Sequence, residues 1–444
     1  MPGFYVENFG CRATQADGAA IEGQLLERGL RRVPGPDSAE VVVLNTCTVT
    51  ASADQDVRAA IRRIHRKNPN CKILVTGCYA QRAPEELAQL PGVNWVVGNS
   101  HKHQVASVVC GSTAFIPLHS VSTLHDPRGA QVIVGDIFAH TELMAAPVFD
   151  GGGEKTRPNL KVQDGCDNRC SFCIIPSVRG ASRSLPKAEV LSQVGALLAR
   201  GFREVVISGI NLGRWGRDLT PPNRFANLVR SIVEQTELEK LRISSVEPMD
   251  WTPELIDLVA GCERIAKHAH VPLQSGSDRV LRAMHRKYRP WHYEEKICRI
   301  RDAMPTAAIG ADVMVGFPGE TDFDFEATRR MIEQLPLTYL HVFTYSSRPG
   351  TASAAMARQV PVQVARERNR VLRELAAQKK GEFMRSFIGR QLPAITLSAA
   401  NQESTEALTD NYLKVRLAGR HGANQWVGAQ VQEVRAEELL ATVV

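Results

Sequence analysis

The sequence contains no apolar run near the length of a membrane span, so a membrane-spanning helix is not expected. Residues 1–7 lack the basic segment followed by an apolar one that marks a secretory signal. Aromatic residues make up only 6% of the chain, but the 43% hydrophobic and 23% charged fractions are those of an ordinary globular protein. We therefore expect a globular protein that stays in the cytoplasm and has no membrane partner.

The length and the cysteine content narrow the class further. A chain of 444 residues exceeds the size at which one core keeps growing, so we expect two or three domains. Ten cysteines in a reducing compartment favour metal or redox use over a disulfide framework. The net charge of +7 is compatible with an anionic partner and equally with general solubility. The sequence does not indicate an oligomeric state.

A C-x3-C-x2-C stretch is the most informative pattern in the chain. Cys166, Cys170 and Cys173 can close three thiolates around one metal cluster. In a [4Fe-4S] cluster three protein thiolates would leave one iron open to another ligand. Structural zinc normally closes with a fourth Cys or His at short spacing, and none follows here. The spacing favours an iron-sulfur cluster, with zinc and a group of buried thiols as the alternatives.

Three further cysteines follow apolar segments in the first hundred residues. Strands are expected at residues 4–6, 41–44 and 72–75, with helices at 14–31 and 53–67 between them, which predicts a parallel sheet. Ligands gather outside the carboxyl ends of such strands. Cys11, Cys47 and Cys78 all lie there, so we interpret them as a second three-thiolate cluster; the alternative is three small buried residues in turns. Cys71 precedes its strand and is interpreted as a structural thiol.

A longer alternation of strands and helices begins near residue 159. Six strands are expected, at residues 159–163, 204–207, 241–246, 267–273, 308–315 and 339–345. Six such units predict a partial (β/α)6 barrel with its active site at the carboxyl ends of the strands. Candidates for cofactor contacts at these ends, with hydrogen bonding at the barrel mouth as the alternative, are Ser208, Gly209, Glu247, Gln274 and Ser275. His268 and His270 are expected to fill the barrel interior rather than to bind metal.

The last part of the chain changes character after a long helix expected at residues 362–387. Short segments at 392–397, 412–417 and 425–434 predict a small β-barrel, a common nucleic-acid-binding appendage. Tyr412, Lys414 and Arg416 alternate, so they are expected on one strand face that either contacts RNA or is merely solvated. The fold class is therefore α/β, with predicted domains at residues 1–110, 145–385 and 386–444.

These residues resemble the radical S-adenosylmethionine methylthiotransferases over almost the whole chain. The N-terminal motifs that carry the resemblance are Gly10-Cys11, Asn45-Thr46-Cys47 and Thr76-Gly77-Cys78. The C-x3-C-x2-C stretch resembles the radical-SAM triad of that family, and residues 208–213, 244–248, 271–277 and 310–320 resemble its barrel motifs. The terminal β-module resembles a TRAM domain, the RNA-contacting appendage of the family.

The resemblance implies cofactors, partners and a reaction. It implies two [4Fe-4S] clusters, one at each cysteine triad, together with S-adenosyl-L-methionine, a tRNA substrate and an electron donor that reduces the cluster. One-electron cleavage of S-adenosylmethionine would give a deoxyadenosyl radical. A methylated sulfur held at Cys11, Cys47 and Cys78 would then be transferred to carbon 2 of an adenine.

Residues 45–50 and 77–82 are most similar to one branch of the family, which modifies N6-threonylcarbamoyladenosine at position 37 of tRNA. Residues 408–412 add modest support. Ser208 stands where this branch more often has threonine, and residues 397–402 lack the expected acidic strand end and following glycine. The alternatives are isopentenyladenosine in tRNA or a ribosomal-protein aspartate as the acceptor, or a non-catalytic iron-sulfur RNA-binding protein.

Overall fold

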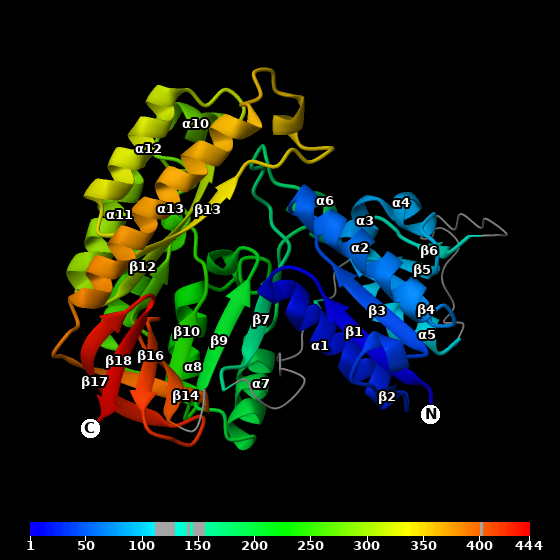
Figure 1. Ribbon diagram of the computed structural model, residues 1–444, viewed down its shortest axis with the longest axis horizontal. Helices are drawn as coiled ribbons and strands as arrows, with labels where there is room; N and C mark the ends of the chain where they lie inside the picture. Colours follow the sequence, from blue (N-terminus) through cyan, green and yellow to red (C-terminus); the bar gives the residue numbers. More distant parts are fainter. Residues whose placement is uncertain (112–128, 140–142, 145–155, 400–402) are drawn as a thin grey trace. The chain divides into compact units, whose positions relative to one another are not determined.

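The computed structural model describes residues 1–111, 129–139, 143–144, 156–399 and 403–444 (Figure 1). Contacts divide the chain into two compact units. Unit 1 comprises Met1–Val148, Leu160–Leu185 and Ser346–Ala354, and unit 2 comprises Phe149–Asn159, Pro186–Tyr345 and Ala355–Val444. None of the described helices is both long enough and apolar enough to cross a membrane.

Unit 1 is built on a parallel sheet, as the sequence predicts. The order among the described strands is β2-β1-β3-β4-β5-β6. The strands are β1 (Gly3–Asn8), β2 (Arg31–Arg32), β3 (Val41–Thr46), β4 (Lys72–Gly77), β5 (Val93–Gly98) and β6 (Gln131–Ile133). The helices are α1 (Arg12–Glu27), α2 (Ala51–Lys67), α3 (Cys78–Arg82), α4 (Pro84–Ala88) and α5 (Val105–Val109). The sequence missed β2, β5 and β6, so the sheet is wider than the three strands expected.

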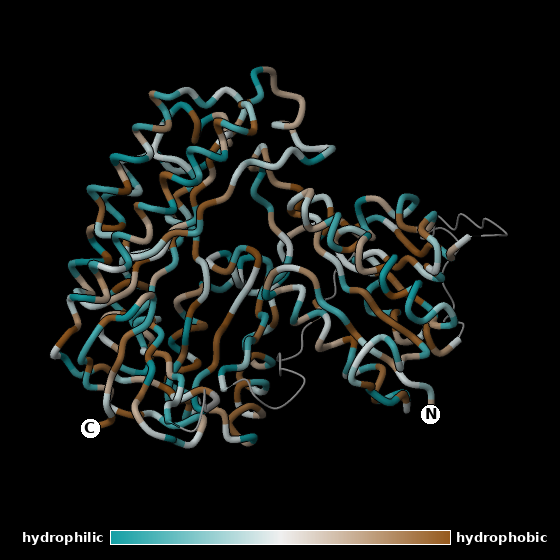
Figure 2. The backbone as a smooth tube through the Cα atoms, in the orientation of Figure 1, coloured by the Kyte–Doolittle hydropathy of each residue, from teal (hydrophilic) through white to brown (hydrophobic). Residues whose placement is uncertain are grey.

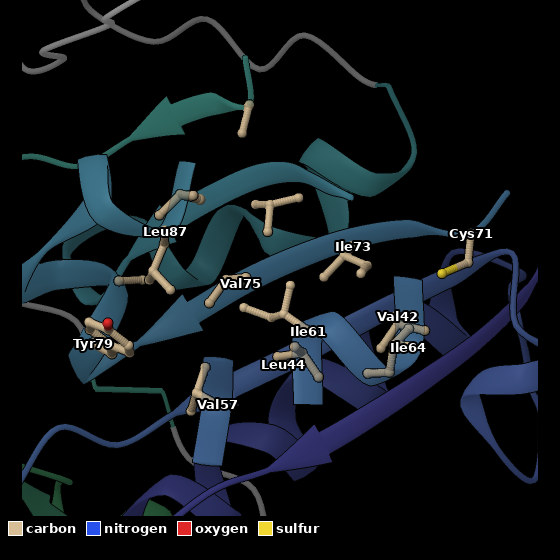
Figure 3. Close-up of a cluster of buried hydrophobic side chains, with 14 of the residues drawn as sticks. Val42, Leu44, Val57, Ile61, Ile64, Cys71, Ile73, Val75, Tyr79 and Leu87 are labelled. Atoms are coloured by element: carbon tan, nitrogen blue, oxygen red, sulfur yellow. The ribbon is translucent and has the colours of Figure 1, made fainter. Parts of the chain in front are cut away.

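The two faces of this sheet carry separate hydrophobic cores, because successive side chains of a strand point to opposite faces. Val42 and Leu44 of β3 join one core with the α2 residues Val57, Ile61 and Ile64 (Figure 3). Val41 and Val43 of the same strand join the other core with residues of α1 and α5. The central strands β3 and β4 are accordingly coloured largely as hydrophobic in Figure 2.

Cys71 lies in the first of these cores, 5% exposed, at the end of the cluster opposite Tyr79 (Figure 3). The prediction that this cysteine is a structural thiol, away from the carboxyl ends of the strands, is consistent with that position.

A second chain segment completes unit 1. Its strand β7 (Asn159–Asp164) pairs antiparallel with the short β8 (Arg183–Ser184). Between them lie the C-x3-C-x2-C loop and the short helix α6 (Ile175–Arg179). This segment is therefore folded against the same compact unit as the N-terminal sheet.

Unit 2 contains the remaining strands of the predicted partial barrel, and they are parallel. They are β9 (Glu204–Gly209), β10 (Lys240–Ile243), β11 (His268–His270), β12 (Ala308–Val315) and β13 (Tyr339–Thr344). β9 pairs with β10, a bridge between Ser245 and His270 links β10 to β11, and β11, β12 and β13 pair in sequence. The helices are α7 (Lys187–Ala199), α8 (Phe225–Gln235), α9 (Pro253–Gly261), α10 (Asp278–Ala283), α11 (Pro290–Ala303) and α12 (Asp322–Gln334).

The chain ends in the expected long helix and small β-barrel. Helix α13 spans Val362–Arg385, and the described strands after it close in the order β14-β15-β16-β18-β17. They are β14 (Gln391–Ala399), β15 (Ser404–Thr409), β16 (Lys414–Ala418), β17 (Trp426–Arg435) and β18 (Glu438–Val443). The prediction of a terminal β-barrel is confirmed.

The assignment of Tyr412 to a strand is wrong. Its φ of 69° is left-handed and therefore not that of a strand residue. It lies in the turn between β15, which ends at Thr409, and β16, which begins at Lys414. The ring lies 4.8 Å from the ring of His268 and 6.1 Å from that of Tyr339, within unit 2. Arg416 pairs with Glu438, while Lys414 is exposed. Tyr412 is thus part of the packing around β11 and β13.

Candidate functional site

The three N-terminal cysteines lie at the carboxyl ends of neighbouring parallel strands. Cys11 is the N-cap residue of α1, Cys47 follows β3 directly, and Cys78 begins α3 directly after β4. β3 pairs with both β1 and β4, so these ends share one edge of the sheet. A Cβ atom on Gly10 would lie 2.9 Å from the sulfur of Cys47, which places the Cys11 loop against that thiol.

The thiols also affect one another electrostatically. Burial, together with the neighbouring Cys78 and Cys11 thiols, raises the pKa of Cys47 to about 12. The sulfur of Cys78 accepts a hydrogen bond from Asn99 Nδ2 at 3.5 Å. Thiolates hold iron-sulfur clusters, and binding of metal displaces their protons. The donor chemistry of this triad therefore fits a cluster.

Gly77 sets the turn that delivers Cys78 to this edge. Its φ is 100°, and a Cβ atom there would lie 2.4 Å from the carbonyl oxygen of Thr46 and 2.6 Å from its nitrogen. A side chain at this position must therefore adopt a strained backbone and displace β3.

We predict that Gly77→Ala lowers the stability of unit 1 by roughly 1–3 kcal/mol, measured by denaturant unfolding of the metal-free protein. Gly23→Ala is the matched control, because Gly23 lies inside α1 with no heavy atom within 4 Å of the added methyl. The free energy of unfolding of that variant should rise by about 0.5–1 kcal/mol. Equal stabilities for the two variants would contradict this reading of the turn.

The cysteines of the C-x3-C-x2-C loop are half-buried and lie between β7 and α6. The Cys173 N–H donates to the Cys170 carbonyl at 3.1 Å, and the Cys166 N–H donates to the Gly180 carbonyl at 3.1 Å. The sulfur of Cys166 accepts from the Asn168 N–H at 3.4 Å. Backbone hydrogen bonds thus hold the loop at both Cys166 and Cys173, and the Cys166 sulfur already accepts one N–H group.

The structure brings the two triads into one unit. Ile174, just before α6, and Val178, on α6, pack against Cys78 in a small apolar cluster. Asn99 Nδ2 donates to the Val178 carbonyl at 2.7 Å as well as to the Cys78 sulfur. The helix that follows Cys173 is therefore in direct contact with a cysteine of the N-terminal triad.

A buried group of charges, which we call the core ion network, joins the same segments. Its members are Asp17, Lys102, Lys161, Asp164 and Arg179, all buried. Asp17 accepts from Lys161, from Lys102 Nζ at 2.7 Å and from Arg179 Nη2 at 3.0 Å. Asp164 accepts from Lys161 Nζ at 2.8 Å and from Arg179 Nη1 at 2.8 Å through each oxygen.

This network carries three cations against two carboxylates. Burial alone would raise the pKa of Asp17, but Lys102, Lys161 and Arg179 together lower it to about 2. Arg179 Nη2 also reaches Thr14 Oγ1 at 3.5 Å, and that hydroxyl lies 3.6 Å from the sulfur of Cys11. The excess positive charge therefore lies next to thiols, where it favours their anionic form.

A second polar group holds the loop around Cys47. Thr48 Oγ1 donates to Asp54 at 2.6 Å and accepts from Arg82 Nε at 2.8 Å, and Arg82 also binds Asp54. Arg348 binds Asp54 at 2.8 Å and the Thr48 carbonyl at 3.1 Å. Three separate parts of unit 1 meet here.

The candidates in unit 2 lie at strand ends as expected. Ser208 is the penultimate residue of β9 and Gly209 its last. The Ser208 hydroxyl is buried, and no residue described by the structure hydrogen-bonds to it. Glu247 follows β10 and is paired with Arg286; burial raises its pKa, while the guanidinium acts in the opposite sense. An unpartnered buried hydroxyl is the feature in this group that most clearly suits an absent ligand.

Gln274 and Ser275 have local partners. The Gln274 N–H donates to the Asp312 carbonyl at 2.8 Å, and its φ is 62°. Ser275 is buried; its hydroxyl accepts from the Ser277 N–H at 3.2 Å and lies 3.3 Å from Thr328 Oγ1. Their part in cofactor binding stays a prediction.

The two histidines of β11 contact neighbouring side chains in unit 2. His268 Nε2 lies 2.7 Å from the Tyr339 hydroxyl, and His270 Nε2 lies 3.3 Å from Asp312 Oδ1. Within the described part of the chain, no three His, Cys, Asp or Glu side chains are close enough to bind a single metal ion. A four-iron cluster is larger than one ion, so its thiolates stand farther apart.

Sequence reasoning missed the core ion network. The signal in the sequence was the charge within the buried strand β7, where Lys161 and Asp164 interrupt an apolar pattern just before Cys166. Fully buried lysine and aspartate side chains are rare unless they are paired. Their partners Asp17 and Lys102 were not recognisable from local sequence.

Comparison with known proteins gives the family. The model of the uncharacterized protein family UPF0004 matches residues 3–98, and that of the radical SAM superfamily matches residues 160–332. The chain is 36% identical over 416 residues to the threonylcarbamoyladenosine tRNA methylthiotransferase MtaB of Aquifex aeolicus, covering 93% of this chain and 96% of that protein. This chain belongs to the radical S-adenosylmethionine methylthiotransferases. It is 33% identical to the tRNA-2-methylthio-N(6)-dimethylallyladenosine synthase of Syntrophotalea carbinolica, covering 90% of each.

This methylthiotransferase is accordingly a radical-SAM enzyme that modifies tRNA, and it uses S-adenosylmethionine with a [4Fe-4S] cluster. The radical S-adenosylmethionine methyltransferase TsrM from Kitasatospora setae shares its fold, with a TM-score of 0.61 at 15% identity, over 79% of this chain and 74% of that one.

Proposed function

We propose that the enzyme adds a methylthio group to carbon 2 of N6-threonylcarbamoyladenosine at position 37 of tRNA. The observation that carries the acceptor is the shared name of the relatives at 35–36% identity, although at 32% identity both names occur. Proteins named for threonylcarbamoyladenosine reach 36% in Aquifex aeolicus, 36% in Bacillus subtilis and 35% in Rickettsia prowazekii. The dimethylallyladenosine synthase of Syntrophotalea carbinolica reaches 33%. Residues 45–50 and 77–82, which resemble the same branch, add support.

Each cysteine triad is proposed to hold one [4Fe-4S] cluster. Cys166, Cys170 and Cys173 would hold the cluster that binds S-adenosylmethionine, and Cys11, Cys47 and Cys78 would hold the auxiliary one. When bound, these groups supply a carbon-centred radical and a site for the transferred sulfur. Support for the pairing is that both triads belong to unit 1, with α6 packed on Cys78.

The side chains around Cys78 and Cys11 are proposed to shield the auxiliary cluster from water and to surround its sulfurs with hydrogen bonds and positive charge. Ile174 and Val178 exclude water beside Cys78, which strengthens electrostatic interactions there. Asn99 donates toward the Cys78 sulfur, and the core ion network supplies excess positive charge next to Cys11. Hydrogen bonds and charge around cluster sulfurs are the means by which proteins adjust reduction potential.

Contacts with S-adenosylmethionine are proposed for the strand ends of unit 2. The unpartnered hydroxyl of Ser208 and the adjoining Gly209 are the best-supported positions. Glu247, Gln274 and Ser275 complete the candidate set. Localisation in the cytoplasm, an external electron donor and domain boundaries at residues 1–110, 145–385 and 386–444 belong to the same proposal.

The acceptor is tested by mass spectrometry of tRNA nucleosides from cells that lack this protein. We expect 2-methylthio-N6-threonylcarbamoyladenosine to disappear, N6-threonylcarbamoyladenosine to accumulate, and the product to return on complementation. A loss of 2-methylthio-isopentenyladenosine, with 2-methylthio-N6-threonylcarbamoyladenosine unchanged, would show that the acceptor is isopentenyladenosine. The relative at 33% identity is named for that kind of acceptor.

A further inference from the structure

One stretch of chain after the last barrel strand belongs to unit 1. Residues 346–354 are part of that unit, although the chain on both sides of them belongs to unit 2. We call these residues the crossing segment. Its Arg348 and Ser353 are buried, which is unusual for polar side chains in a connection between a strand and a helix. The burial indicates that this segment does more in unit 1 than join β13 to α13.

One end of the crossing segment holds the loop that follows Cys47. Arg348 Nη1 donates to the Thr48 carbonyl at 3.1 Å and to Asp54 Oδ2 at 2.8 Å. The buried Asp54 also accepts from Arg82 of α3, the helix that begins at another cysteine of the same triad. The Arg348 guanidinium therefore connects the crossing segment to the loops of two N-terminal cysteines.

The other end of the crossing segment holds the C-x3-C-x2-C loop. The Ser353 N–H donates to the Ser171 carbonyl at 2.8 Å, and Ser171 directly follows Cys170. Arg348 and Ser353 are close in sequence. One short piece of chain therefore contacts a cysteine-bearing loop of each triad, and all three pieces lie in unit 1.

A tight turn between these two contacts fixes their spacing. The Thr351 N–H donates to the Arg348 carbonyl at 3.1 Å, and the Thr351 hydroxyl donates to the same oxygen at 2.7 Å. Pro349 and Gly350 occupy the two central positions, and the φ of Gly350 is 86°. This is the arrangement of a type II turn, in which proline fixes one dihedral angle and glycine accepts the left-handed one. The turn holds the two contacts at one separation.

We propose that Arg348 is a positioning residue that sets the distance between the two cluster sites. It holds the auxiliary triad through Thr48 and Asp54, while Ser353 of the same segment holds the C-x3-C-x2-C loop. The inference rests on the proposed function, because it requires a cluster at each triad. The radical and the transferred sulfur must both reach one adenine, and small misplacements of reacting groups cost large factors in rate. A wrong separation therefore yields 5'-deoxyadenosine without the matching amount of methylthiolated nucleoside.

The test uses the full-length, cluster-loaded protein and two readouts. The first is the amount of methylthiolated nucleoside formed per 5'-deoxyadenosine with the tRNA substrate. The second is the magnetic coupling between the two reduced clusters in electron paramagnetic resonance, which falls steeply as their separation grows. Arg348→Met should lower the first ratio about 10-fold or more and alter the coupling, while 5'-deoxyadenosine formation changes less than about 2-fold. Arg348→Lys keeps a cationic donor toward Asp54 and should restore most of both readouts.

Arg58→Met is the matched control, because Arg58 also joins elements around the N-terminal triad. It donates to the Tyr79 hydroxyl at 2.6 Å and to Glu86 at 2.7 Å, on α3 and α4. Both readouts should stay unchanged in this control. Gly350→Ala is a second test variant, since its methyl meets no heavy atom within 4 Å but its backbone is strained. It disturbs the turn and leaves Arg348 in place, and it should lower the product ratio about 2-fold or more.

An unchanged product ratio and unchanged magnetic coupling in Arg348→Met would overturn the proposal. An equal fall of product and 5'-deoxyadenosine would also overturn it, because that result reports loss of folded protein and not a change in separation. If Arg348→Met does not retain its iron, Gly350→Ala decides, and an unchanged ratio in that variant rejects the positioning role.

Failure of the proposed function gives a different result. If the auxiliary cluster is absent, the unaltered protein itself holds about four irons and shows no magnetic coupling, before any variant is compared. If isopentenyladenosine is the acceptor, Arg348→Met lowers the product ratio with that tRNA instead, so the positioning role stands while the proposed acceptor is wrong.

Discussion

A Cys166→Ala variant is expected to lose about four irons per chain and to form no 5'-deoxyadenosine from S-adenosylmethionine under anaerobic reduction. A Cys11→Ala variant is expected to lose the same amount of iron but still to form 5'-deoxyadenosine, without transferring sulfur to tRNA. The reason is that the two triads lie on different elements: Cys166 lies between β7 and α6, and Cys11 lies at the start of α1. Iron analysis and chromatography of the reaction measure both effects.

Cys71→Ala is the control for this pair. Cys71 is buried in the hydrophobic core at the opposite end of β4 (Figure 3), so its loss should leave the iron content at about eight per chain and both activities intact. A full iron complement in Cys11→Ala would contradict the auxiliary cluster. Loss of 5'-deoxyadenosine in that variant would contradict the separation of the two roles.

Arg179→Met is expected to destabilise unit 1 by roughly 1–3 kcal/mol, because Asp17 and Asp164 both lose charge-assisted hydrogen bonds while Lys102 and Lys161 still balance their charge. Arg179 binds both Asp17 and Asp164, so it joins α1 to the segment that bears Cys166. Hydrogen exchange of the β3 and β4 amides in the metal-free protein should report the loss. Methionine keeps the length of the side chain, so the change removes charge and hydrogen bonds more than volume.

Arg63→Met is the matched control in the same unit. Arg63 pairs with Glu7 at 3.3 Å with half of its side chain exposed, and exposed pairs contribute about 0–1 kcal/mol. If Arg179→Met changed exchange no more than this control does, the core ion network would have no structural role. A large effect would show that this network stabilises the unit that contains both triads.

The fold was predictable where strands repeat a simple pattern. Val41 to Leu44 and Ile73 to Val75 are continuous apolar runs, and both are buried central strands. β5 was not predicted because Asn94 interrupts its apolar residues and leaves a run of only three, Trp95 to Val97. β6 has three residues, too few for any periodicity. Such strands are recognisable only through the partners with which they pair.

The positions of the candidate cysteine ligands were predictable from the sequence, but the side chains that surround them were not. Strand ends and spacing point to Cys11, Cys47 and Cys78 from local sequence alone. The contact between Lys161 and Asp17 spans 144 residues, and no local pattern encodes it. Tyr412 shows the same limit: its alternation with Lys414 is typical of a strand, yet its backbone is left-handed and its ring lies against His268 and Tyr339.

The most direct test is a reaction with two RNA substrates. The anaerobically reconstituted enzyme is given S-adenosylmethionine, a reductant, and tRNA carrying either N6-threonylcarbamoyladenosine or N6-isopentenyladenosine. We predict methylthiolation of the first RNA, with 5'-deoxyadenosine formed, and little or none of the second. Methylthiolation of the second RNA alone, or 5'-deoxyadenosine without any methylthiolated nucleoside, would contradict the account.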